Sequence, residues 1–559
     1  MSKPVRTVNL IDLYSEGLEY YIGRKFLRHQ VKKTPKYLDP HEIISGDVKV
    51  NKTFIILNVL MSLVYLSWWF NFRNAGSPIL FGLLLVGEIY HVWQAVGYSI
   101  TIWNQTKTPH KPVEEAYPVD VFITVCGEPP EVVEKTLIAA TSMDYPNFKV
   151  YILNDSFSRK LPGWQEINDL AEKYGAYSIT RDNNKGFKAG NVNNALRQTN
   201  SPFIAVFDAD HIPHKDFLQK TMGHFSDPEM VLVQTPQYYQ NREYSFLTTA
   251  AWEQQELFFG PICRGKSNMN STFWCGTNAV IRRSALEEIG GVPENNIAED
   301  FLASYFFHAN KKKTIYIAEI LAQGLAPTDL ANYVRQQFRW ARGSSEIMFR
   351  HNPIFNKNLT WQQKVQYLYS SSYYLNGFIA LLDAIIPIIV LATGIVPVND
   401  TTANFVLYFF PFIFFTIVLL MFSTLNTITY KAIQLSMSSS FVFIQAVLSA
   451  LFRKKVSFEV TSKNLEEGNF LKFAYPHIAY LILGIAAITL GLVRDGFVPS
   501  TITNASWVIF NVSMLSGFIR VAYPWGRLFG RLKVYFYRRN FVPSFISNIE
   551  EEVLVKPPA

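Results

Sequence analysis

Two aspartates separated by one residue, Asp208 and Asp210, follow directly after an apolar run at residues 204–207. Such a run is typical of a buried strand, and alternate side chains of an extended segment point the same way. The two carboxylates can therefore converge on one cation, and oxygen ligands suit Mg²⁺ or Mn²⁺. A lone Asp-x-Asp pair is more often a polar strand end or a turn, so the assignment depends on the residues around it.

Further residues that could take part in catalysis or ligand binding lie at predicted strand ends, in loops and at helix starts. They are Asp155, Lys188, the pair Glu299 and Asp300, and Gln336 with Arg339 and Trp340. The segment around the lysine, residues 185–191, contains two glycines that permit close backbone approach, and a helix N-terminus there favours phosphate. Each feature alone also has a structural explanation as a turn, a helix start or an interfacial anchor.

The elements that must position these side chains alternate between strand and helix. The pattern predicts strands at 119–125, 149–153, 177–180 and 204–208, and helices at 130–142 and 188–198. Alternation at this spacing indicates a mostly parallel sheet with right-handed crossovers. Ligands of such sheets bind at the carboxyl ends of the strands.

The composition indicates a polar block and membrane helices in one chain. At 559 residues two or more units are expected, and 49% hydrophobic with only 17% charged residues is shifted toward membrane proteins. The net charge of +8 fits a membrane protein with basic cytoplasmic segments better than nucleic-acid binding. The three cysteines, Cys126, Cys263 and Cys275, lack CxxC or Cys/His spacing, so neither a disulfide framework nor a zinc site is predicted.

Six apolar segments are long enough to span a membrane. They lie at 53–72, 79–103, 369–396, 404–425, 474–493 and 505–523. The distribution of Lys and Arg between them places both termini and the α/β domain in the cytoplasm. No secretory signal is predicted at the start of the chain. The segment 434–452 is predicted to be an interfacial amphipathic helix, with a seventh span as the alternative.

At this point the chain resembles the processive family 2 glycosyltransferases, and among them bacterial cellulose synthase catalytic subunits. That family has a D, DxD, TED, QxxRW series, which Asp155, Asp208-x-Asp210, Glu299-Asp300 and Gln336-x-x-Arg339-Trp340 match. The string at 458–463 is similar to the family's FxVTxK gating loop. The resemblance implies a GT-A-like α/β glycosyltransferase domain, with a mostly parallel sheet, inserted between the transmembrane helices of a polytopic membrane protein.

Three departures from the family pattern limit what is carried over. The first acidic motif is Asn154-Asp155-Ser156 where the family has Asp-Asp-Gly, so only Asp155 is transferable. Ala298 stands where Thr usually precedes the Glu-Asp pair. The stretch after the last span is too short for a PilZ domain, so binding of cyclic di-GMP in cis is not expected.

The resemblance also implies roles for individual residues. The expected catalytic residues are Asp300 as general base, Asp208, Asp210 and Arg339, and the metal ligands are Asp208 and Asp210. The expected substrate-binding residues are Thr124, Glu128, Asp155, Lys188, Cys275, Glu299, Gln336, Trp340, Phe458, Val460, Thr461 and Lys463. Together they would transfer glucose from UDP-glucose to the non-reducing end of a growing β-glucan with inversion, while Mg²⁺ or Mn²⁺ holds the diphosphate.

The expected organisation follows from the spans and the resemblance. It comprises a cytosolic basic segment at 1–52, two transmembrane helices at 53–104, a cytosolic glycosyltransferase domain at 117–348, membrane and interfacial helices of a polysaccharide channel at 349–525 with a gating-like loop at 456–464, and a cytosolic basic tail at 526–559. Expected partners are the UDP-sugar, the growing polysaccharide and membrane lipid, with accessory export subunits where the host has an outer membrane. Nucleic acid is not an expected partner.

Three alternative functions remain open from the sequence. The first is synthesis of another polymer, such as a β-1,3 or mixed-linkage glucan or a hyaluronan-like or capsular chain, because motifs do not encode sugar or linkage. The second is a non-processive lipid-linked sugar transferase, which the Gln336 to Trp340 motif disfavours. The third is a transporter or receptor, against which the spans hold few internal charges.

Overall fold

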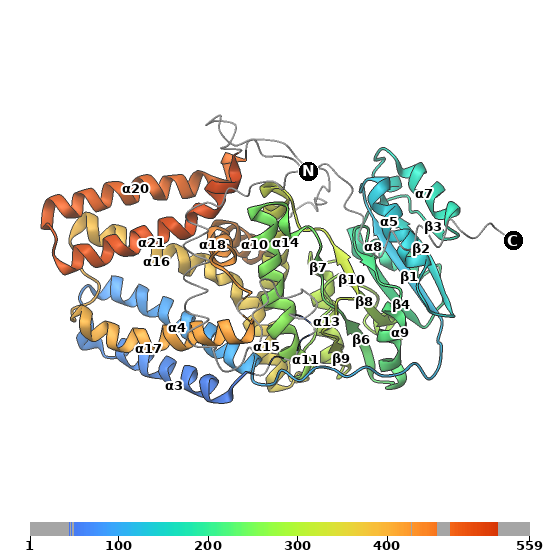
Figure 1. The fold of residues 1–559 in the computed structure, drawn as a ribbon, viewed down its shortest axis with the longest axis horizontal. Coiled ribbons are helices and arrows are strands. Elements are labelled where there is room, and N and C mark those ends of the chain that lie inside the picture. Colours follow the sequence, from blue (N-terminus) through green and yellow to red (C-terminus); the bar gives the residue numbers. More distant parts are fainter. Residues whose placement is uncertain are drawn as a thin grey trace, which may run out of the picture.

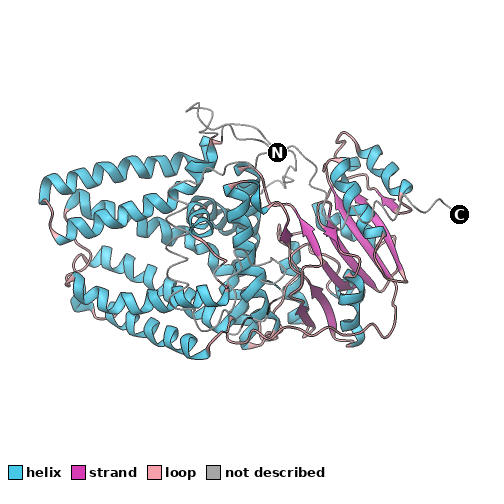
Figure 2. Cartoon of the chain, in the orientation of Figure 1, coloured by secondary structure: helices cyan, strands magenta, loops and turns pink. Residues whose placement is uncertain are grey.

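The computed structural model describes residues 44, 46, 48, 50–425, 427–454 and 470–523. Long helices gather at one end of the molecule, and a sheet covered by shorter helices lies at the other end (Figure 1). Figure 2 shows the strands of this sheet together, away from the long helices. The apolar and polar blocks of the sequence therefore fold as adjacent parts of one molecule.

The main sheet has seven strands in the order β3-β2-β1-β4-β8-β6-β9. Their bounds are Val119–Val125 (β1), Phe148–Asn154 (β2), Tyr177–Ile179 (β3), Phe203–Asp208 (β4), Met230–Gln234 (β6), Ala279–Arg282 (β8) and Lys313–Tyr316 (β9). Neighbouring strands are parallel except for β8, which runs antiparallel to both β4 and β6. The prediction of a mostly parallel sheet is confirmed.

Helices cover both faces of this sheet and complete the domain. They are α5 (Pro130–Thr141), α6 (Asp155–Ser158), α7 (Trp164–Lys173), α8 (Phe187–Leu196), α9 (Phe217–Met222), α10 (Phe246–Leu257), α11 (Cys263–Ser267), α12 (Arg283–Glu288), α13 (Glu299–Ala309) and α14 (Leu330–Arg350). A small sheet of β5 (Ile212–Pro213), β10 (Ala322–Gly324) and β7 (Tyr238–Tyr239) lies beside them.

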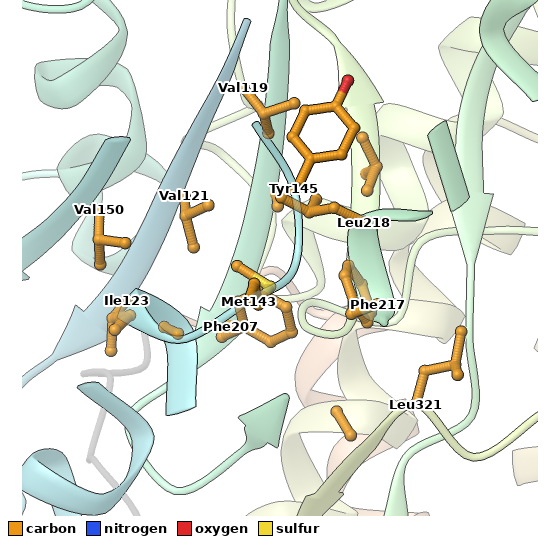
Figure 3. Close-up of a cluster of buried hydrophobic side chains, with 14 of the residues drawn as sticks. Val119, Val121, Ile123, Met143, Tyr145, Val150, Phe207, Phe217, Leu218 and Leu321 are labelled. Atoms are coloured by element: carbon orange, nitrogen blue, oxygen red, sulfur yellow. The ribbon is translucent and has the colours of Figure 1, made fainter. Parts of the chain in front are cut away.

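The strands form the core because both of their faces are apolar. Figure 3 shows one side, where Val121 and Ile123 of β1 meet Val150 of β2 and Phe207 of β4. On the other side Phe122 packs in a second buried cluster. Burial on two faces explains why β4 appears in the sequence as a continuous apolar run rather than as an alternating pattern.

Within the described residues, six helical segments are long and apolar enough to cross a membrane. They are α3 (Lys52–Trp69), α4 (Pro78–Thr101), Trp361–Thr393, α17 (Thr402–Ser423), α20 (Leu471–Asp495) and α21 (Pro499–Ala522). The third consists of α15 (Trp361–Ser372), a short 3₁₀ turn and α16 (Asn376–Thr393). Each coincides with a predicted span, although this third segment begins earlier than residue 369.

The predicted interfacial helix at 434–452 is a bent pair of helices. These are α18 (Tyr430–Ser438) and α19 (Ser440–Leu451), which meet at 44°. The pair packs against α10, α14, α16 and α21, so it lies between the sheet domain and the long helices. Counted as one span, the pair would bring the total to seven.

Candidate active site

A cleft with about 1300 Å³ of empty space opens at the carboxyl ends of β1, β2 and β4. Every predicted site residue within the described part of the chain lines it, namely Thr124, Glu128, Asp155, Lys188, Asp208, Asp210, Cys275, Glu299, Asp300, Gln336, Arg339 and Trp340. The remaining four, Phe458, Val460, Thr461 and Lys463, fall outside the described residues. The roles of all these residues stay predictions.

The register of the sheet brings the first acidic groups together. Thr124 of β1 pairs with Asp208 of β4, and Val125 pairs with Asn154 of β2. The Thr124 hydroxyl donates a hydrogen bond to Asp208 Oδ1 at 3.2 Å. Because Asp155 directly follows Asn154, it reaches the same edge of the sheet. The positions were predictable because parallel strands end together.

Asp208 is the centre of a charged network. The Lys188 ammonium forms an ion pair with Asp208 Oδ1 and donates to the Gly276 carbonyl at 2.8 Å. Burial alone would raise the pKa of the Asp208 carboxyl, but the Lys188 ammonium and the nearby His211 ring outweigh it and lower the pKa. This carboxyl group is therefore held in its ionised form.

Gly276 permits the close approach of the next acidic pair. A Cβ at this residue would lie 3.1 Å from Asp300 Oδ2 and 3.6 Å from Lys188 Nζ, and the backbone there has a φ of +81°. A side chain would therefore be strained and would crowd both groups. The glycine lets the start of α13 reach the Asp208 network.

Glu299 and Asp300 occupy the first turn of α13, where carboxylates stabilise the helix dipole. The preceding Ala298 gives no side-chain cap, whereas Asp300 Oδ1 accepts a hydrogen bond from the Phe301 N–H at 2.7 Å. Burial raises the pKa of both carboxyl groups above the usual range, and the Asp300 charge raises that of Glu299 further. A carboxylate with a raised pKa is a suitable proton acceptor.

The helix α14 brings the last motif to the cleft. Its residues Gln336, Arg339 and Trp340 line the same space, and the Gln336 amide donates to the Tyr239 hydroxyl at 3.4 Å. A Cβ on Gly343 would lie 2.2 Å from the Ala298 Cβ. Close packing of α14 on the start of α13 therefore depends on this glycine.

Asp155 has a partner that sequence reasoning missed. Arg181 Nε and Nη2 donate to the two carboxylate oxygens of Asp155 at 2.6 and 2.5 Å. The same guanidinium donates to the carbonyls of Lys185 and Phe187 at 2.6 and 2.7 Å. Burial still raises the pKa of the Asp155 carboxyl, with Arg181 opposing that rise. No motif identifies the arginine, because the contact joins segments that are adjacent only in the folded sheet.

Cys275 lies in a loop whose backbone is fixed by two glutamines. Its N–H donates to Gln234 Oε1 at 2.9 Å, and its carbonyl accepts from Gln237 Nε2 at 2.7 Å. Burial raises the pKa of the Cys275 thiol well above its usual value. The thiol is therefore suited to contact a ligand as a neutral group and unsuited to act as a nucleophile.

Further cleft residues were also absent from the prediction. They are Arg159, Asn184, His211, Gln237 and Tyr239. Only the position of His211, directly after the Asp-x-Asp pair, offered a signal in the sequence.

The residues present fit a divalent cation held jointly with a substrate. The described residues contain no preformed group of three metal-ligating side chains. Asp208 and Asp210 nevertheless line one cleft, and the buried His211 lies beside them, with its Nδ1 3.4 Å from Asp210 Oδ1. Mg²⁺ is commonly bound by one or two carboxylates, with water and substrate phosphates as the other ligands. This donor set is compatible with such a site.

Two family profiles match the chain. Residues 117–343 match the family described as "Glycosyltransferase like family 2", and residues 287–545 match the family described as "Cellulose synthase". The matches overlap across α13 and α14, which carry the Glu299 pair and the Gln336 to Trp340 motif. The predicted GT-A-like α/β fold is confirmed by the glycosyltransferase match together with the observed sheet.

Curated relatives are named cellulose synthase catalytic subunit (UDP-forming). The protein of Pseudomonas fluorescens (strain SBW25) is 31% identical over 503 residues, covering 84% of this chain and 66% of that protein. The protein of Xanthomonas axonopodis pv. citri (strain 306) is 36% identical over 325 residues, covering 56% of this chain and 44% of that protein. The chain therefore spans 66% or less of the lengths of these relatives.

Among solved structures, the mannosyltransferase PcManGT from Pyrobaculum calidifontis, in complex with GDP-Man and Mn²⁺, matches with a TM-score of 0.47 and 17% identity. The match covers 67% of this chain and all of that one.

The assignment to a family rests on the two family matches and the curated relatives, and the predicted resemblance is confirmed. The chain thus carries glycosyltransferase family 2 and cellulose synthase domains and is a homologue of the cellulose synthase catalytic subunits.

Proposed function

We propose that the chain is an inverting, UDP-glucose-dependent synthase that adds glucose processively to the non-reducing end of a β-glucan and moves the product across a membrane. This proposal rests on the observation that residues of three motifs line one cleft. Lys188 and Asp208 form an ion pair, Gly276 admits Asp300 beside them, and Arg339 and Trp340 line the same space.

Asp155, Thr124 and Glu128 would hold the uridine end of the donor. Glu128 Oε2 already accepts a hydrogen bond from the Cys126 N–H at 2.5 Å, which fixes that turn beside the cleft. Lys188 and Arg339 would contact the diphosphate, because cationic donors stabilise the negative charge that builds on the leaving UDP. Glu299 and Gln336 would complete the substrate contacts.

Asp208 and Asp210 would hold Mg²⁺ or Mn²⁺ on the diphosphate, with the His211 ring beside them. A divalent cation there neutralises charge on the leaving group. Lys188 complements this role from the protein side, since its ammonium forms an ion pair with the Asp208 carboxylate.

Asp300 is the proposed general base. The acceptor hydroxyl attacks the anomeric carbon, the bond from that carbon to the UDP oxygen breaks, and the hydroxyl proton passes to the Asp300 carboxylate. A single displacement inverts the anomeric centre, and no carboxylate nucleophile is assigned. Burial, which raises the pKa of Asp300, makes it a stronger base than an exposed aspartate.

Trp340 and Cys275 are proposed to contact the acceptor sugar. An aromatic face stacks on a sugar ring at little entropic cost, and a neutral thiol adds a small contact beside it. The long helices place the chain among multi-pass membrane proteins, and we assign the cleft and both termini to the cytoplasm from the distribution of basic residues. The gating-like loop at 456–464 would close over the nucleotide.

The proposal is tested with detergent-purified full-length protein and separate radiolabelled UDP-sugars in Mg²⁺ or Mn²⁺. A long polymer from UDP-glucose supports it. A lipid-linked monosaccharide, or no transfer from any UDP-sugar, would reject it.

A further inference from the structure

A short apolar segment is exposed where the chain passes from the sheet domain to the membrane helices. It runs from the 3₁₀ helix η5 (Pro353–Phe355) into the first turn of α15, and we call residues 353–364 the wedge segment. Figure 1 shows α15 between the long helices and the sheet domain. The side chains of Ile354, Phe355 and Trp361 are 52%, 79% and 63% exposed. Grouped exposure of large apolar side chains is typical of a contact surface.

The backbone of the wedge segment is held by hydrogen bonds. The Lys364 ammonium donates to the Ile354 carbonyl at 3.0 Å, which ties the loop to the first turn of α15. The Thr360 hydroxyl accepts from the Gln363 N–H at 3.2 Å, and the Gln363 amide oxygen accepts from the Thr360 N–H at 3.0 Å. The exposed apolar side chains therefore stand on a capped helix start rather than on a frayed end.

The depth of the wedge segment follows from the helices beside it. The helical segment Trp361–Thr393 has 33 residues, so at about 1.5 Å per residue it is roughly 50 Å long and exceeds a hydrocarbon core of about 30 Å. The Gln366 amide donates to the hydroxyl of Thr101, the last residue of α4, at 2.9 Å. Trp361 lies one helical turn and a half beyond Gln366, about 7.5 Å along the axis. A headgroup layer is about 5–8 Å thick, so Trp361 lies at its depth.

A second pair of residues marks the same boundary. Lys52 begins α3 and Trp103 closely follows α4. The Lys52 ammonium lies 5.0 Å from the centroid of the Trp103 ring, and this ring is exposed. Exposed Trp and basic side chains at the ends of spans are typical of the membrane–water interface. Because Trp103 stands just beyond Thr101, the interface lies close to the level of Trp361.

The wedge segment is basic as well as apolar. It contains Lys357 and Lys364, and no Asp or Glu occurs in the sequence between Glu346 and Asp383. Neither lysine forms an ion pair with a described residue. Apolar rings flanked by ammonium groups without carboxylate partners match a membrane surface with anionic headgroups. The continuity of the segment with a membrane helix favours this partner over a soluble protein.

The wedge segment also contacts the helix that carries Asp300. The Asn356 amide donates to the Tyr305 hydroxyl at 2.9 Å, and Leu359 packs with Phe301 and Tyr305 in a buried cluster. Phe301 and Tyr305 belong to α13, whose first turn contains Asp300. A displacement of the wedge segment would therefore act directly on α13.

We propose that the wedge segment inserts into an anionic membrane surface and that this contact holds α13 in its active position. The Phe355 and Trp361 rings enter the boundary between headgroups and acyl chains, and the Lys357 and Lys364 ammonium groups bind lipid phosphates. The lipid contact is independent of the chemistry in the cleft, whereas its effect on turnover rests on the proposed function.

The contact is tested with purified full-length protein in nanodiscs whose acyl chains carry bromine, which quenches tryptophan fluorescence at short range. The chain has 11 tryptophans, so the contribution of Trp361 is the quenching that is lost in Trp361→Phe. We expect a clear loss. The matched control is Trp164→Phe on α7 of the sheet domain, which should retain the wild-type quenching.

The role of lipid charge is tested by sugar transfer in nanodiscs with rising fractions of phosphatidylglycerol in phosphatidylcholine. Turnover of the wild type should rise with phosphatidylglycerol. Lys357→Gln should need about fivefold more of it for half-maximal turnover, because one lysine at an anionic surface contributes about that preference. The exposed Lys149→Gln on β2 is the matched control and should keep the wild-type midpoint. Unchanged UDP affinity shows that the variants are folded.

Three results overturn the inference: equal quenching of Trp361→Phe and the wild type, wild-type turnover that does not respond to phosphatidylglycerol, or a wild-type midpoint in Lys357→Gln. These failures are distinct from failure of the proposed function. Absence of sugar transfer in every lipid mixture rejects the proposed synthase, while the quenching measurement still decides whether the wedge segment contacts lipid.

Discussion

Asp300 is the residue on which the proposed chemistry depends most. Replacing it by Asn keeps the shape of the side chain but removes the proton acceptor. We expect Asp300→Asn to lower sugar transfer by about 10²–10⁴-fold, the usual contribution of a general base, while the dissociation constant of UDP changes little. Initial rates with UDP-glucose and equilibrium UDP binding measure the two effects. Glu131→Gln, in the first turn of α5, is the control. Parallel loss of UDP binding would contradict the assigned role.

The raised pKa of Asp300 makes the pH dependence of the reaction testable. A general base acts in its ionised form, so the rate falls as pH drops through its pKa. Since burial raises the pKa of Asp300, the acid limb of kcat/KM should lie above the usual aspartate pKa of about 3.9. A pH profile from acid to neutral measures it. An acid limb at the ordinary aspartate value would show that this carboxylate is not the base.

Arg181 is a positioning residue for the nucleotide end of the cleft. Arg181→Ala leaves the buried Asp155 carboxylate unpaired, which typically costs about 3–5 kcal/mol of stability. It also releases the carbonyls of Lys185 and Phe187 beside Lys188. We expect a higher KM for UDP-glucose with a smaller change in kcat, measured by steady-state kinetics. Arg181→Lys should not restore KM, because an ammonium cannot make the bidentate contact. Full recovery of the wild-type KM in Arg181→Lys would show that only the positive charge at this position matters.

At the scale of elements, the approach of α14 to α13 sets the catalytic geometry. In Gly343→Ala the added methyl would meet the Ala298 Cβ, and such overpacking usually costs about 1–3 kcal/mol. We expect kcat to fall, because the displacement separates Arg339 from Asp300. Gly82→Ala is the control, since its Cβ would meet nothing within 4 Å. Turnover and thermal unfolding of both variants measure the effect. Equal turnover would show that this crossing does not position the site.

Sequence reasoning located the elements better than the contacts between them. A continuous apolar run at 204–207 identified β4, because both faces of a central strand are buried. The carboxyl ends of β2 and β4 then placed Asp155 and Asp208 at one edge. The bend between α18 and α19 was not predicted, although three consecutive serines, 438–440, lie at the break, and the Ser439 hydroxyl donates to the Leu435 carbonyl.

The contacts that were missed depend on tertiary structure. The pairing of Arg181 with Asp155 joins the end of β3 to the end of β2, and the Gly343 contact joins two helices. The joining of His91 and Asp383 similarly crosses between two spans that are distant in sequence. Motif spacing identifies residues that contact a ligand. Residues that contact and position one another can be identified only when the folded structure is known.

At the scale of the whole molecule, the cleft and the long helices form parts of one proposed pathway. The helix α14 carries Trp340 at the cleft and packs against α19, which in turn packs against α16. Synthesis and translocation are therefore proposed to be consecutive steps performed by one chain.

Coupling of synthesis to translocation is the central claim of this account. It is tested most directly by reconstituting the purified full-length protein in sealed liposomes and supplying radiolabelled UDP-glucose and Mg²⁺ to the outside only. We predict a long polymer that resists added β-1,4-glucanase until detergent opens the liposomes. The Asp300→Asn protein should make none. A polymer digested without detergent, or label recovered only as a lipid-linked sugar, would contradict the claim.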